Sequence, residues 1–372
     1  MSLADKIADE IGVCRQTVSA VIHGHHNKVS PKKLQQILEL LDRYGYRPDP
    51  NARALFGYSN HTIGLIIPAL SAVVTLPMLQ ALNYEIVKSG YKCYIVSPAD
   101  VDEEREAVRE FCARKVDGII SAWLREDFDF AGCPVPVVTI CERGGEFQVD
   151  YYKGMTLVLE HLFSVHGHTK ICFTCDRVQS NQEKYAAYRE FMQRYKLHEL
   201  PPLETRYVPV EESSRTAAEL VRSGTVTAFA GTGDILMGRF LNRLMRAGIR
   251  IPEDCACTGF DGGILSISSP RQLSSAIHPA GELAKLGVEA LLRKIEDRIR
   301  CKLPEHYVAP AFFRGETCGC SGMVFGGSCN DLSLDRLKDI PENRSCFDFQ
   351  EPVANGKKKT DSGIRKTKKR RI

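Results

Sequence analysis

Apolar positions near the start of the chain recur with helical spacing in three short runs, at residues 4–11, 18–22 and 34–41. A glycine breaks the first run, and the short turn that follows is typical of a helix-turn-helix. Ser30 is predicted to cap the third helix, with Pro31 in its first turn, where the missing N–H group of proline is tolerated. The inward face of this third helix is predicted to consist of Leu34, Ile37, Leu38 and Leu41. Three such helices can close a small core of their own.

The second helix is the candidate DNA reader, because its outward positions carry mostly polar side chains. Arginine and glutamine match guanine and adenine edges in the major groove, and serine and threonine hydroxyls suit phosphate oxygens. The outward positions are Arg15, Gln16, Thr17, Ser19 and Ala20. The same pattern also fits an ordinary solvated helix face, so the spacing alone leaves both interpretations open.

Beyond residue 61 the pattern changes to apolar β-like runs that alternate with helical stretches. The β-like runs lie at 62–67, 93–96, 118–122 and 135–140, and after Asp150 at 170–174, 206–208, 228–230 and 255–259. Such alternation predicts parallel, doubly wound sheets with helices on both faces, and its restart predicts two α/β lobes. Because ligands bind beyond the carboxyl ends of parallel strands, two facing lobes favour a small-molecule site between them.

Length and composition exclude several classes of protein. The 372 residues are more than a single hydrophobic core usually supports, so more than one domain is expected. With 43% hydrophobic and 26% charged residues, the chain is not mainly disordered, a collagen-like fibre or a small disulfide scaffold. No apolar run approaches the roughly 20 residues of a membrane span, and no secretory signal is recognisable. We therefore expect a cytoplasmic protein without a membrane partner, whose fourteen cysteines are mostly small buried side chains in a reducing compartment.

The formal net charge of +4 is unevenly distributed along the chain. Residues 351–372 carry a net +7, residues 1–61 carry +2, and residues 62–350 carry −5. The basic end has the composition of a disordered arm. It is expected either to be a solvated tail or to add non-specific, salt-dependent affinity for DNA.

Four motifs resemble those of the LacI/GalR (lactose- and galactose-repressor) family of transcription factors. They are IAxxIGVCRQTVS at 7–19, YGYRP at 44–48, NARAL at 51–55 and TIGLI at 62–66. Their combination in this order is highly specific, and the resemblance runs from about residue 3 to residue 320. It implies an all-α helix-turn-helix headpiece and a two-lobed body similar to periplasmic sugar-binding proteins. The expected divisions are a headpiece at 1–46, a hinge helix and linker at 47–61, a body at 62–320 and an unmatched tail at 321–372, with the lobe boundary near 150–165, strands crossing back near 275–320 and disorder from 351.

The resemblance implies DNA contacts beyond the reading helix. The hinge helix would enter the minor groove, where Leu55 would insert between base steps and kink the duplex. Ala52 would let the backbone approach closely, and Arg53 would reach the groove or a phosphate; a buried linker position is the alternative for Leu55. The other implied DNA-binding residues are His23, Lys28 and Ser30.

One departure from the family affects the reading helix directly. Cys14 stands where the family usually has a serine or threonine that caps this helix. Cysteine is a poor capping residue, so the helix is expected to start less firmly. Because other base-reading positions also differ, the operator sequence cannot be transferred from the family.

The resemblance also places an effector between the two lobes. Asp261, in the Gly-Phe-Asp motif at 259–261, matches an aspartate that accepts hydrogen bonds from ligand hydroxyls; a loop cap after a strand is the alternative. Lys184 stands where most members have an arginine, and without the planar fork the ligand or its angle is expected to differ. Trp123 could stack on a sugar face or pack in the core. The candidate effector-binding residues are Ser71, Trp123, Glu142, Lys184, Thr232, Asp234, Asp261 and His278.

Candidate metal and catalytic motifs are weak. Cys172 and Cys175 form a CxxC pair, but they lie in a strand pattern with no second ligand pair at the spacing of a zinc site. Cys318 and Cys320, with Cys329 and Cys346 beyond them, leave a metal or redox role open. No metal ion or cofactor is therefore assigned. The chain has no GxSxG elbow, P-loop or HExxH motif, so we do not expect an enzyme.

Taken together, these features predict a sequence-specific DNA-binding transcriptional regulator, most naturally a repressor. A homodimer would place two headpieces on the half-sites of a near-palindromic operator, on the nucleoid in the cytoplasm. A small molecule between the lobes, a sugar or sugar derivative, would control operator affinity allosterically. The alternative is a small-molecule-binding protein or a sugar-processing enzyme built on the same α/β body.

Overall fold

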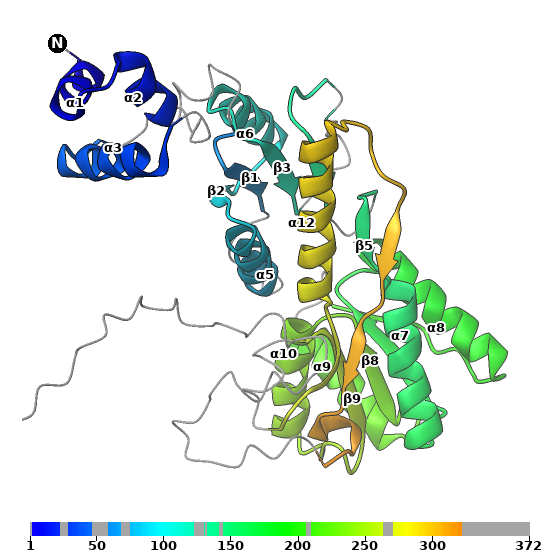
Figure 1. The fold of residues 1–372 in the computed structure, drawn as a ribbon. Helices are drawn as coiled ribbons and strands as arrows, with labels where there is room; N and C mark the ends of the chain where they lie inside the picture. The colour runs from blue at the N-terminus through cyan, green and yellow to red at the C-terminus, as the bar shows by residue number, and fades with distance from the viewer. Residues whose placement is uncertain are drawn as a thin grey trace, which may run out of the picture.

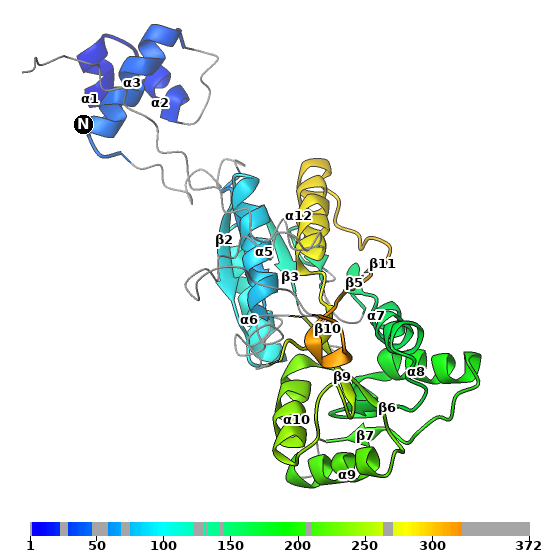
Figure 2. The ribbon, with the colours of Figure 1, turned by 90° about the horizontal axis from the view of Figure 1, so that it is seen from below.

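The structure is a computed structural model in which three parts follow one another along the chain, a helical head and two α/β lobes (Figures 1 and 2). It describes residues 2–22, 29–46, 59–67, 75–122, 130, 132–140, 144–205, 210–262 and 271–321. None of the helices in these ranges is long and apolar enough to cross a membrane.

The head consists of three helices around one small core. They are α1 (Leu3–Ile11), α2 (Arg15–Ile22) and α3 (Pro31–Arg43). Helix α1 begins with a capping box, in which the Ser2 hydroxyl accepts from the Asp5 amide and the Asp5 carboxylate accepts from the Ser2 amide. It ends at Gly12, whose φ of 63° is left-handed. Ile7, Val18 and Ile37, one from each helix, are fully buried in the shared core.

Two expectations for α3 are wrong. Leu38 is 45% exposed, and Leu40 is buried beside Leu41 in its place. Residues three and four apart share one helix face, so a face centred on Ile37 includes positions 40 and 41 and turns position 38 away. Ser30 does occupy the N-cap position, but its side chain makes no capping hydrogen bond.

The first lobe contains a four-stranded parallel sheet, as predicted. Its strands are β1 (Thr62–Ile66), β2 (Lys92–Val96), β3 (Gly118–Ser121) and β4 (Val137–Thr139), in the order β2-β1-β3-β4. Helices α5 (Thr75–Lys88) and α6 (Val101–Ala113) connect the first three strands. Ile63 and Leu65 pack with α5, whereas Ile66 packs against Phe111 of α6 on the other face.

The second lobe contains a six-stranded sheet in the order β12-β10-β9-β8-β6-β7. The strands are β6 (Ile171–Cys175), β7 (Leu203–Glu204), β8 (Ala228–Gly231), β9 (Ala256–Asp261), β10 (Ser274–Ile277) and β12 (Ala311–Phe313). The helices are α7 (Tyr151–Glu160), α8 (Gln182–Arg194), α9 (Val210–Arg222) and α10 (Asp234–Arg246). One edge differs from the expected all-parallel sheet, because β12 pairs antiparallel with β10. The strand expected at 206–208 lies outside the described residues.

Side chains alternate between the two faces of strand β6, and this alternation separates the two cysteines of its CxxC pair. Phe173 and Cys175 face the core shared with α7 and α8, whereas Cys172 faces the core formed with α9 and α10. Residues three apart on a strand point to opposite faces, so the two thiols cannot hold one metal ion. The interpretation of this pair as buried strand residues is therefore confirmed.

Three segments cross between the lobes, and the sequence pattern did not predict the three strands and the long helix that form them. The chain crosses from β5 (Phe147–Val149) into α7, from β10 into α12 (Ala280–Asp297), and back through β11 (His306–Val308), which pairs with β5. Helix α12 packs on α5, β3 and β4 of the first lobe (Figure 1). A buried ion pair lies at this crossover, where Lys294 Nζ is 2.5 Å from Glu146 Oε1.

Candidate functional site

The surface of α2 carries the side chains expected to read DNA. Val18 and Val21 are buried against the other helices, which turns the opposite side outward. Arg15 and Gln16 are exposed, whereas the other three outward positions are half-buried. Arg15 Nε lies 3.5 Å from Asp5 Oδ1 of α1, so the neighbouring helix orients this guanidinium group. The exposure of these side chains is compatible with base contacts, which remain a prediction.

Cys14 occupies the cap of α2. Its Sγ lies 3.1 Å from Thr17 Oγ1, and the Thr17 amide donates to the Cys14 carbonyl at 2.9 Å. The hydrogen bond with the Thr17 side chain, followed by its amide, lowers the pKa of the exposed thiol. The thiol therefore takes the place of a hydroxyl cap, although sulfur is a weaker acceptor than oxygen.

Replacing Cys14 with serine is expected to make α2 start more firmly, because a hydroxyl oxygen accepts a better hydrogen bond from the first turn. Hydrogen exchange of the amides in Arg15–Ile22 should slow by about two- to tenfold. Cys301→Ser, at an exposed cysteine outside the head, serves as the control. Equal or faster exchange in Cys14→Ser would show that the thiol already caps as well as oxygen.

Several predicted site residues lie outside the described residues. On the DNA side these are His23, Lys28, Ala52, Arg53 and Leu55. On the effector side they are Ser71, Trp123 and Glu142. Residues 322–372, with Cys329, Cys346 and the basic end at 351–372, also lie outside.

The other five candidate effector residues lie together at the carboxyl ends of the strands of the second lobe. Lys184 lies on α8, Thr232 follows β8 and Asp234 is the first residue of α10. Asp261 is the last residue of β9, and His278 directly follows β10. The strand order reverses between β6 and β8, because β7 lies on the far side of β6. Open parallel sheets bind their ligands beside such a reversal.

Lys184 is buried in the middle of this group. Its Nζ donates to the Thr232 carbonyl at 2.9 Å. The same nitrogen lies 3.9 Å from the centroid of the Phe260 ring and 4.6 Å from that of Tyr151. Ring faces stabilise a desolvated ammonium group, so the central residue of the Gly-Phe-Asp motif and the first residue of α7 hold this charge in place. The sequence offered no signal for Tyr151.

Asp234 is 2% exposed and carries a strongly perturbed carboxyl group. Burial raises its pKa to about 8. The hydrogen bond from Ser275 lowers this pKa, whereas the negative charge of Asp261 raises it further. Ser275 Oγ donates to Oδ1 at 2.7 Å, whereas Oδ2 is buried without a hydrogen bond. Near neutral pH this carboxyl group is therefore a neutral donor with one oxygen still unpaired. A Cβ at position 259 would collide with Asp234 Oδ1, so any side chain there would displace this carboxyl group.

His278 offers a second unpaired atom in the same place. Its Nδ1 is buried without a hydrogen bond. Burial, followed by the charge of Lys184, lowers its pKa to about 4, so the imidazole is neutral at neutral pH. The His278 amide donates to the Asp261 carbonyl at 2.8 Å. Asp261 itself has a left-handed φ of 97°, a conformation that costs free energy in a non-glycine residue and is concentrated at binding sites.

Comparison with known proteins shows where similar chains occur. A family profile described as a periplasmic binding protein-like domain matches residues 159–318. Catabolite control protein A of Priestia megaterium is 27% identical over 310 residues, which cover 77% of this chain and 90% of that protein. The sucrose operon repressor of Pediococcus pentosaceus is 24% identical, covering 82% and 95%. The HTH-type transcriptional regulator DegA of Bacillus subtilis is 25% identical, covering 74% and 86%.

Solved structures show the same architecture. The lac repressor dimer bound to operator and an anti-inducer matches with a TM-score of 0.69 at 20% identity, covering 86% of this chain and 99% of that one. A transcriptional regulator in complex with cellobiose matches with a TM-score of 0.58 at 18% identity, covering 85% and 100%. The predicted fold class, a helix-turn-helix headpiece followed by a two-lobed body like that of periplasmic binding proteins, is thereby confirmed.

Proposed function

The chain belongs to the LacI/GalR family of transcriptional regulators, and from this premise we propose that it is a repressor whose operator affinity is set by a small polyhydroxylated molecule. The observation that carries the proposal is the cluster around Lys184, in which Asp234 and His278 each keep a buried polar atom without a partner. A buried unpaired polar atom costs about 1–3 kcal/mol. A ligand that pairs both atoms recovers this free energy.

The chemistry of the cluster favours a neutral sugar. A protonated Asp234 can donate, a neutral imidazole can donate or accept at Nδ1, and a hydroxyl group complements each of them because it does both. The flanking rings of Tyr151 and Phe260 add apolar surface beside these polar groups. Sugars combine hydroxyl groups with apolar C–H faces. Among the relatives, one structural neighbour is a complex with cellobiose and one sequence relative is named for sucrose.

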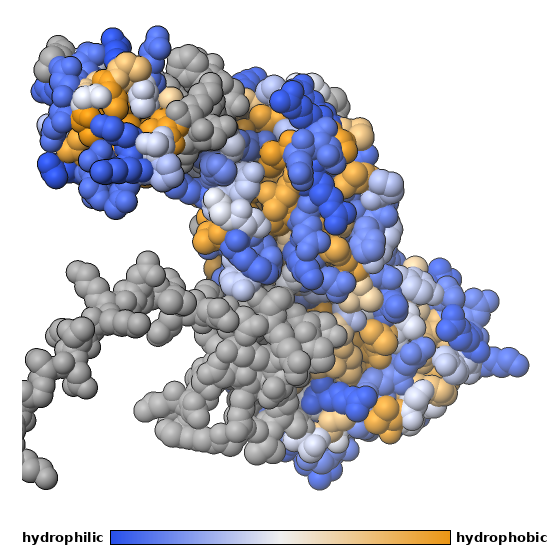
Figure 3. All heavy atoms as spheres, in the orientation of Figure 1, coloured by the Kyte–Doolittle hydropathy of each residue, from blue (hydrophilic) through white to orange (hydrophobic). Residues whose placement is uncertain are grey.

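Operator recognition is assigned to the head. We infer that α2 enters the major groove with Arg15 and Gln16 on base edges, while Leu55 of the hinge enters the minor groove. A near-palindromic operator requires two heads, and therefore a homodimer. Exposed apolar side chains support this assembly, because Leu76 on α5 is 53% exposed and Ile235 on α10 is 41% exposed. Figure 3 shows apolar side chains gathered over the first lobe between polar stretches.

The segments that cross between the lobes can couple ligand binding to the position of the head. Buried residues of both lobes belong to one continuous core that includes Ile63 of the first sheet and Phe173 of the second. A ligand that brings the lobes together would therefore shift the crossover segments and α5, and with them the chain that leads to the head. Such coupling changes operator affinity only as far as the ligand prefers one arrangement of the lobes over the other.

An enzyme on the same body is the second candidate, because a raised Asp pKa beside a lowered His pKa also suits acid–base chemistry. The relatives named above are regulators, and the same pair of neutral groups is what a buried sugar site needs. Incubation of the chain with the ligand, followed by chromatography of the products, separates the two. Turnover would favour the enzyme; recovery of the intact ligand favours the regulator.

The decisive experiment measures operator binding and ligand response together. In a gel shift, the chain should bind its own upstream region with two copies per duplex and prefer it to unrelated DNA. A thermal-shift screen of sugars, sugar phosphates and nucleobases should then identify a ligand that changes this binding. Equal affinity for any duplex would contradict the proposal.

His278→Ala is expected to weaken the ligand by about tenfold to a hundredfold, as the loss of a buried hydrogen bond predicts. The same variant should bind operator DNA as the unaltered chain does, because the head is unchanged. His198→Ala, at an exposed histidine of the same lobe, should leave both affinities as they were. Isothermal titration provides the ligand affinity, and an unaltered affinity in His278→Ala would place the ligand elsewhere.

A further inference from the structure

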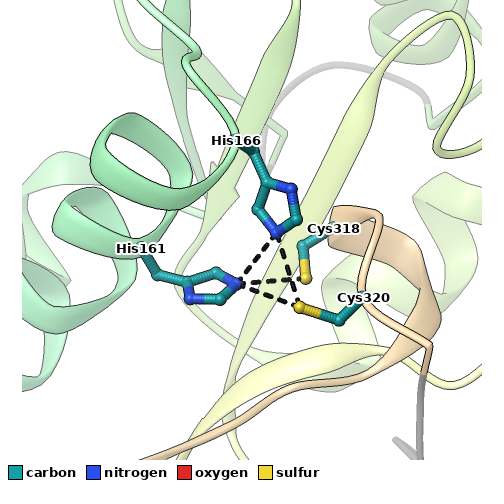
Figure 4. A group of neighbouring side chains, drawn as sticks. All are labelled: His161, His166, Cys318 and Cys320. Atoms are coloured by element: carbon teal, nitrogen blue, oxygen red, sulfur yellow. Dashed lines mark hydrogen bonds between the residues drawn. The ribbon is translucent and has the colours of Figure 1, made fainter.

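Two histidines and two cysteines converge at the end of the second lobe that lies opposite the proposed effector site. They are His161, His166, Cys318 and Cys320 (Figure 4). The Cys318 amide donates to Ser274 Oγ at the first residue of β10. The hydroxyl group of the preceding residue, Thr317, donates to the carbonyl of Cys257 near the start of β9. The cluster therefore lies at the amino ends of these strands, whereas Asp261 and His278 lie at their carboxyl ends.

The four ligand atoms are spaced like the corners of a metal site. They all lie within 4.8 Å of one another. His161 Nε2 is 3.1 Å from His166 Nε2 and 3.3 Å from Cys318 Sγ. Cys320 Sγ is 3.5 Å from the Nε2 atoms of both histidines. A tetrahedral zinc ion, with Zn–N of about 2.0–2.1 Å and Zn–S of about 2.3 Å, has N–N edges of roughly 3.4 Å and N–S edges of roughly 3.5 Å.

Hydrogen bonding alone does not account for this arrangement. His161 Nε2 has three close polar neighbours, one nitrogen and two sulfurs. An imidazole nitrogen carries either one hydrogen or one lone pair, so it can pair fully with only one of them. Figure 4 shows all four side chains pointing inward to one region rather than pairing off. A cation at their centre satisfies all four atoms at once.

The local fold builds the two halves of the cluster. Helix α7 continues into the π-helical turn η2 (His161–Val165), whose wider turn places residues five apart on one side. His166 directly follows this turn, so both imidazoles face the same way. The cysteines come from the 3-10 turn η4 (Glu316–Cys318) and the residue after next, with Gly319 between them at a left-handed φ of 100°. A Cβ at Gly319 would lie 3.3 Å from His166 Nδ1, which makes glycine the residue best suited to this position.

We propose that this cluster is a structural zinc site. Two thiolates and two imidazoles are the donors that Zn²⁺ prefers, whereas Mg²⁺ and Ca²⁺ require oxygen ligands. All four positions are filled by protein side chains, which is typical of a structural site rather than a catalytic one. Binding converts two thiols to thiolates and releases two protons, so that the site is neutral overall.

The zinc ion would link the last turn of the body, η4, to η2, which follows the first helix of the second lobe. Cys318 is separated from His161 by 157 residues, and the described chain ends one residue after Cys320. A metal bond between η2 and η4 closes this long loop and fixes the point from which residues 322–372 continue. His161 and Cys318 are buried, whereas His166 and Cys320 are half-buried, so two of the four ligands are in contact with solvent.

The test uses the untagged full chain, dialysed against metal-free buffer under reducing conditions, with zinc measured by mass spectrometry of the digested protein. We expect one zinc ion per chain. Cys318→Ser with Cys320→Ser should lose it, and so should His166→Asn, a half-buried position at which substitution disturbs the core least. Matched controls are Cys329→Ser with Cys346→Ser in the tail, Cys301→Ser and His198→Asn, each of which should keep one zinc ion.

A second measurement keeps the proposal testable if a variant fails to fold. A strong chelator should lower the Tm of the unaltered chain, and added Zn²⁺, but not Mg²⁺, should restore it. Co²⁺ in place of zinc should show the absorption bands of a tetrahedral site with thiolate ligands. A chain without zinc and without a response to the chelator, a full complement of a different metal, zinc retained in the double cysteine variant, or a disulfide between Cys318 and Cys320 would each overturn the assignment.

Discussion

Replacing Glu146 with glutamine is expected to lower the free energy of unfolding by about 3–5 kcal/mol, because it leaves the buried ammonium group of Lys294 without a counter-charge. Both side chains are only 2% exposed. Glu146 Oε1 accepts from Lys294 Nζ and from the Leu303 amide, each at 2.5 Å. Its Oε2 accepts from the Thr139 amide at 2.9 Å. The amide group of glutamine would place a donor against one of these donors, so an isosteric change does not rescue the site.

Urea unfolding of the full chain measures this loss. Adding Lys294→Met to Glu146→Gln should recover part of it, because no uncompensated charge then remains in the core. Glu106→Gln is the control, since Arg109 and Glu106 form an exposed ion pair at 3.1 Å on α6 and should change stability by less than about 1 kcal/mol. If Glu146→Gln were no more destabilising than Glu106→Gln, the crossover would not depend on this ion pair. If Lys294→Met deepened the loss, charge imbalance would not be its cause.

Asp234→Asn is expected to change how stability depends on pH. The pKa of Asp234 is raised from 3.8 to about 8 in the folded chain, chiefly by burial. Below pH 4 the carboxyl group is protonated in both states. Between pH 4 and pH 8 only the unfolded chain ionises, so the folded state loses stability by up to about 1.4 kcal/mol per pH unit. Above pH 8 both states ionise and the penalty stays constant.

Asparagine lacks this penalty and keeps an oxygen to accept from Ser275. The difference in unfolding free energy between Asp234→Asn and the unaltered chain should therefore shift by several kcal/mol in favour of the variant from pH 4.5 to pH 8.5. Denaturant unfolding of both chains at each pH measures this difference. The contributions of the other titratable groups are common to both chains and therefore cancel in it. Asp254→Asn is the control: Arg250 lowers the pKa of that half-buried carboxyl group, so its difference should be flat over the same range. Parallel curves for Asp234→Asn would mean that the carboxyl group is ionised in the folded chain.

The helices of the head and most strands of the body could be predicted from the sequence. The helices follow from a period of 3.6 and the buried strands from short continuous apolar runs, and both signals can be read within a few neighbouring residues. The same reasoning misplaced one position on the inward face of α3, where Leu40 is buried and Leu38 is not. It also missed α12, although Leu283, Val288 and Leu291 recur at helical spacing on the face that packs on the first lobe, and the antiparallel edge strand β12, whose direction depends on where the chain re-enters the second lobe.

The family resemblance located the candidate effector residues, and the structure shows that five of them are neighbours. Their role as ligand contacts is a proposal, as is the role of the α2 side chains. What the resemblance did not provide is the state of these groups. Lys184 lies against the rings of Tyr151 and Phe260, and Asp234 is neutral at neutral pH, because both are buried among side chains from α7, β9 and β10.

The sequence by itself determined the fold class, the family and which residue types were available for chemistry. Cys318 and Cys320 were visible as a pair, but the sequence suggested Cys329 and Cys346 as their companions. Only the tertiary structure placed His161 and His166 beside them. Burial in the folded lobe made Asp234 a neutral donor and left His278 Nδ1 without a hydrogen bond. The physical reason is the same in each case: a periodic pattern reports on neighbours in sequence, whereas metal geometry and pKa values depend on distance and desolvation among residues that folding alone brings together.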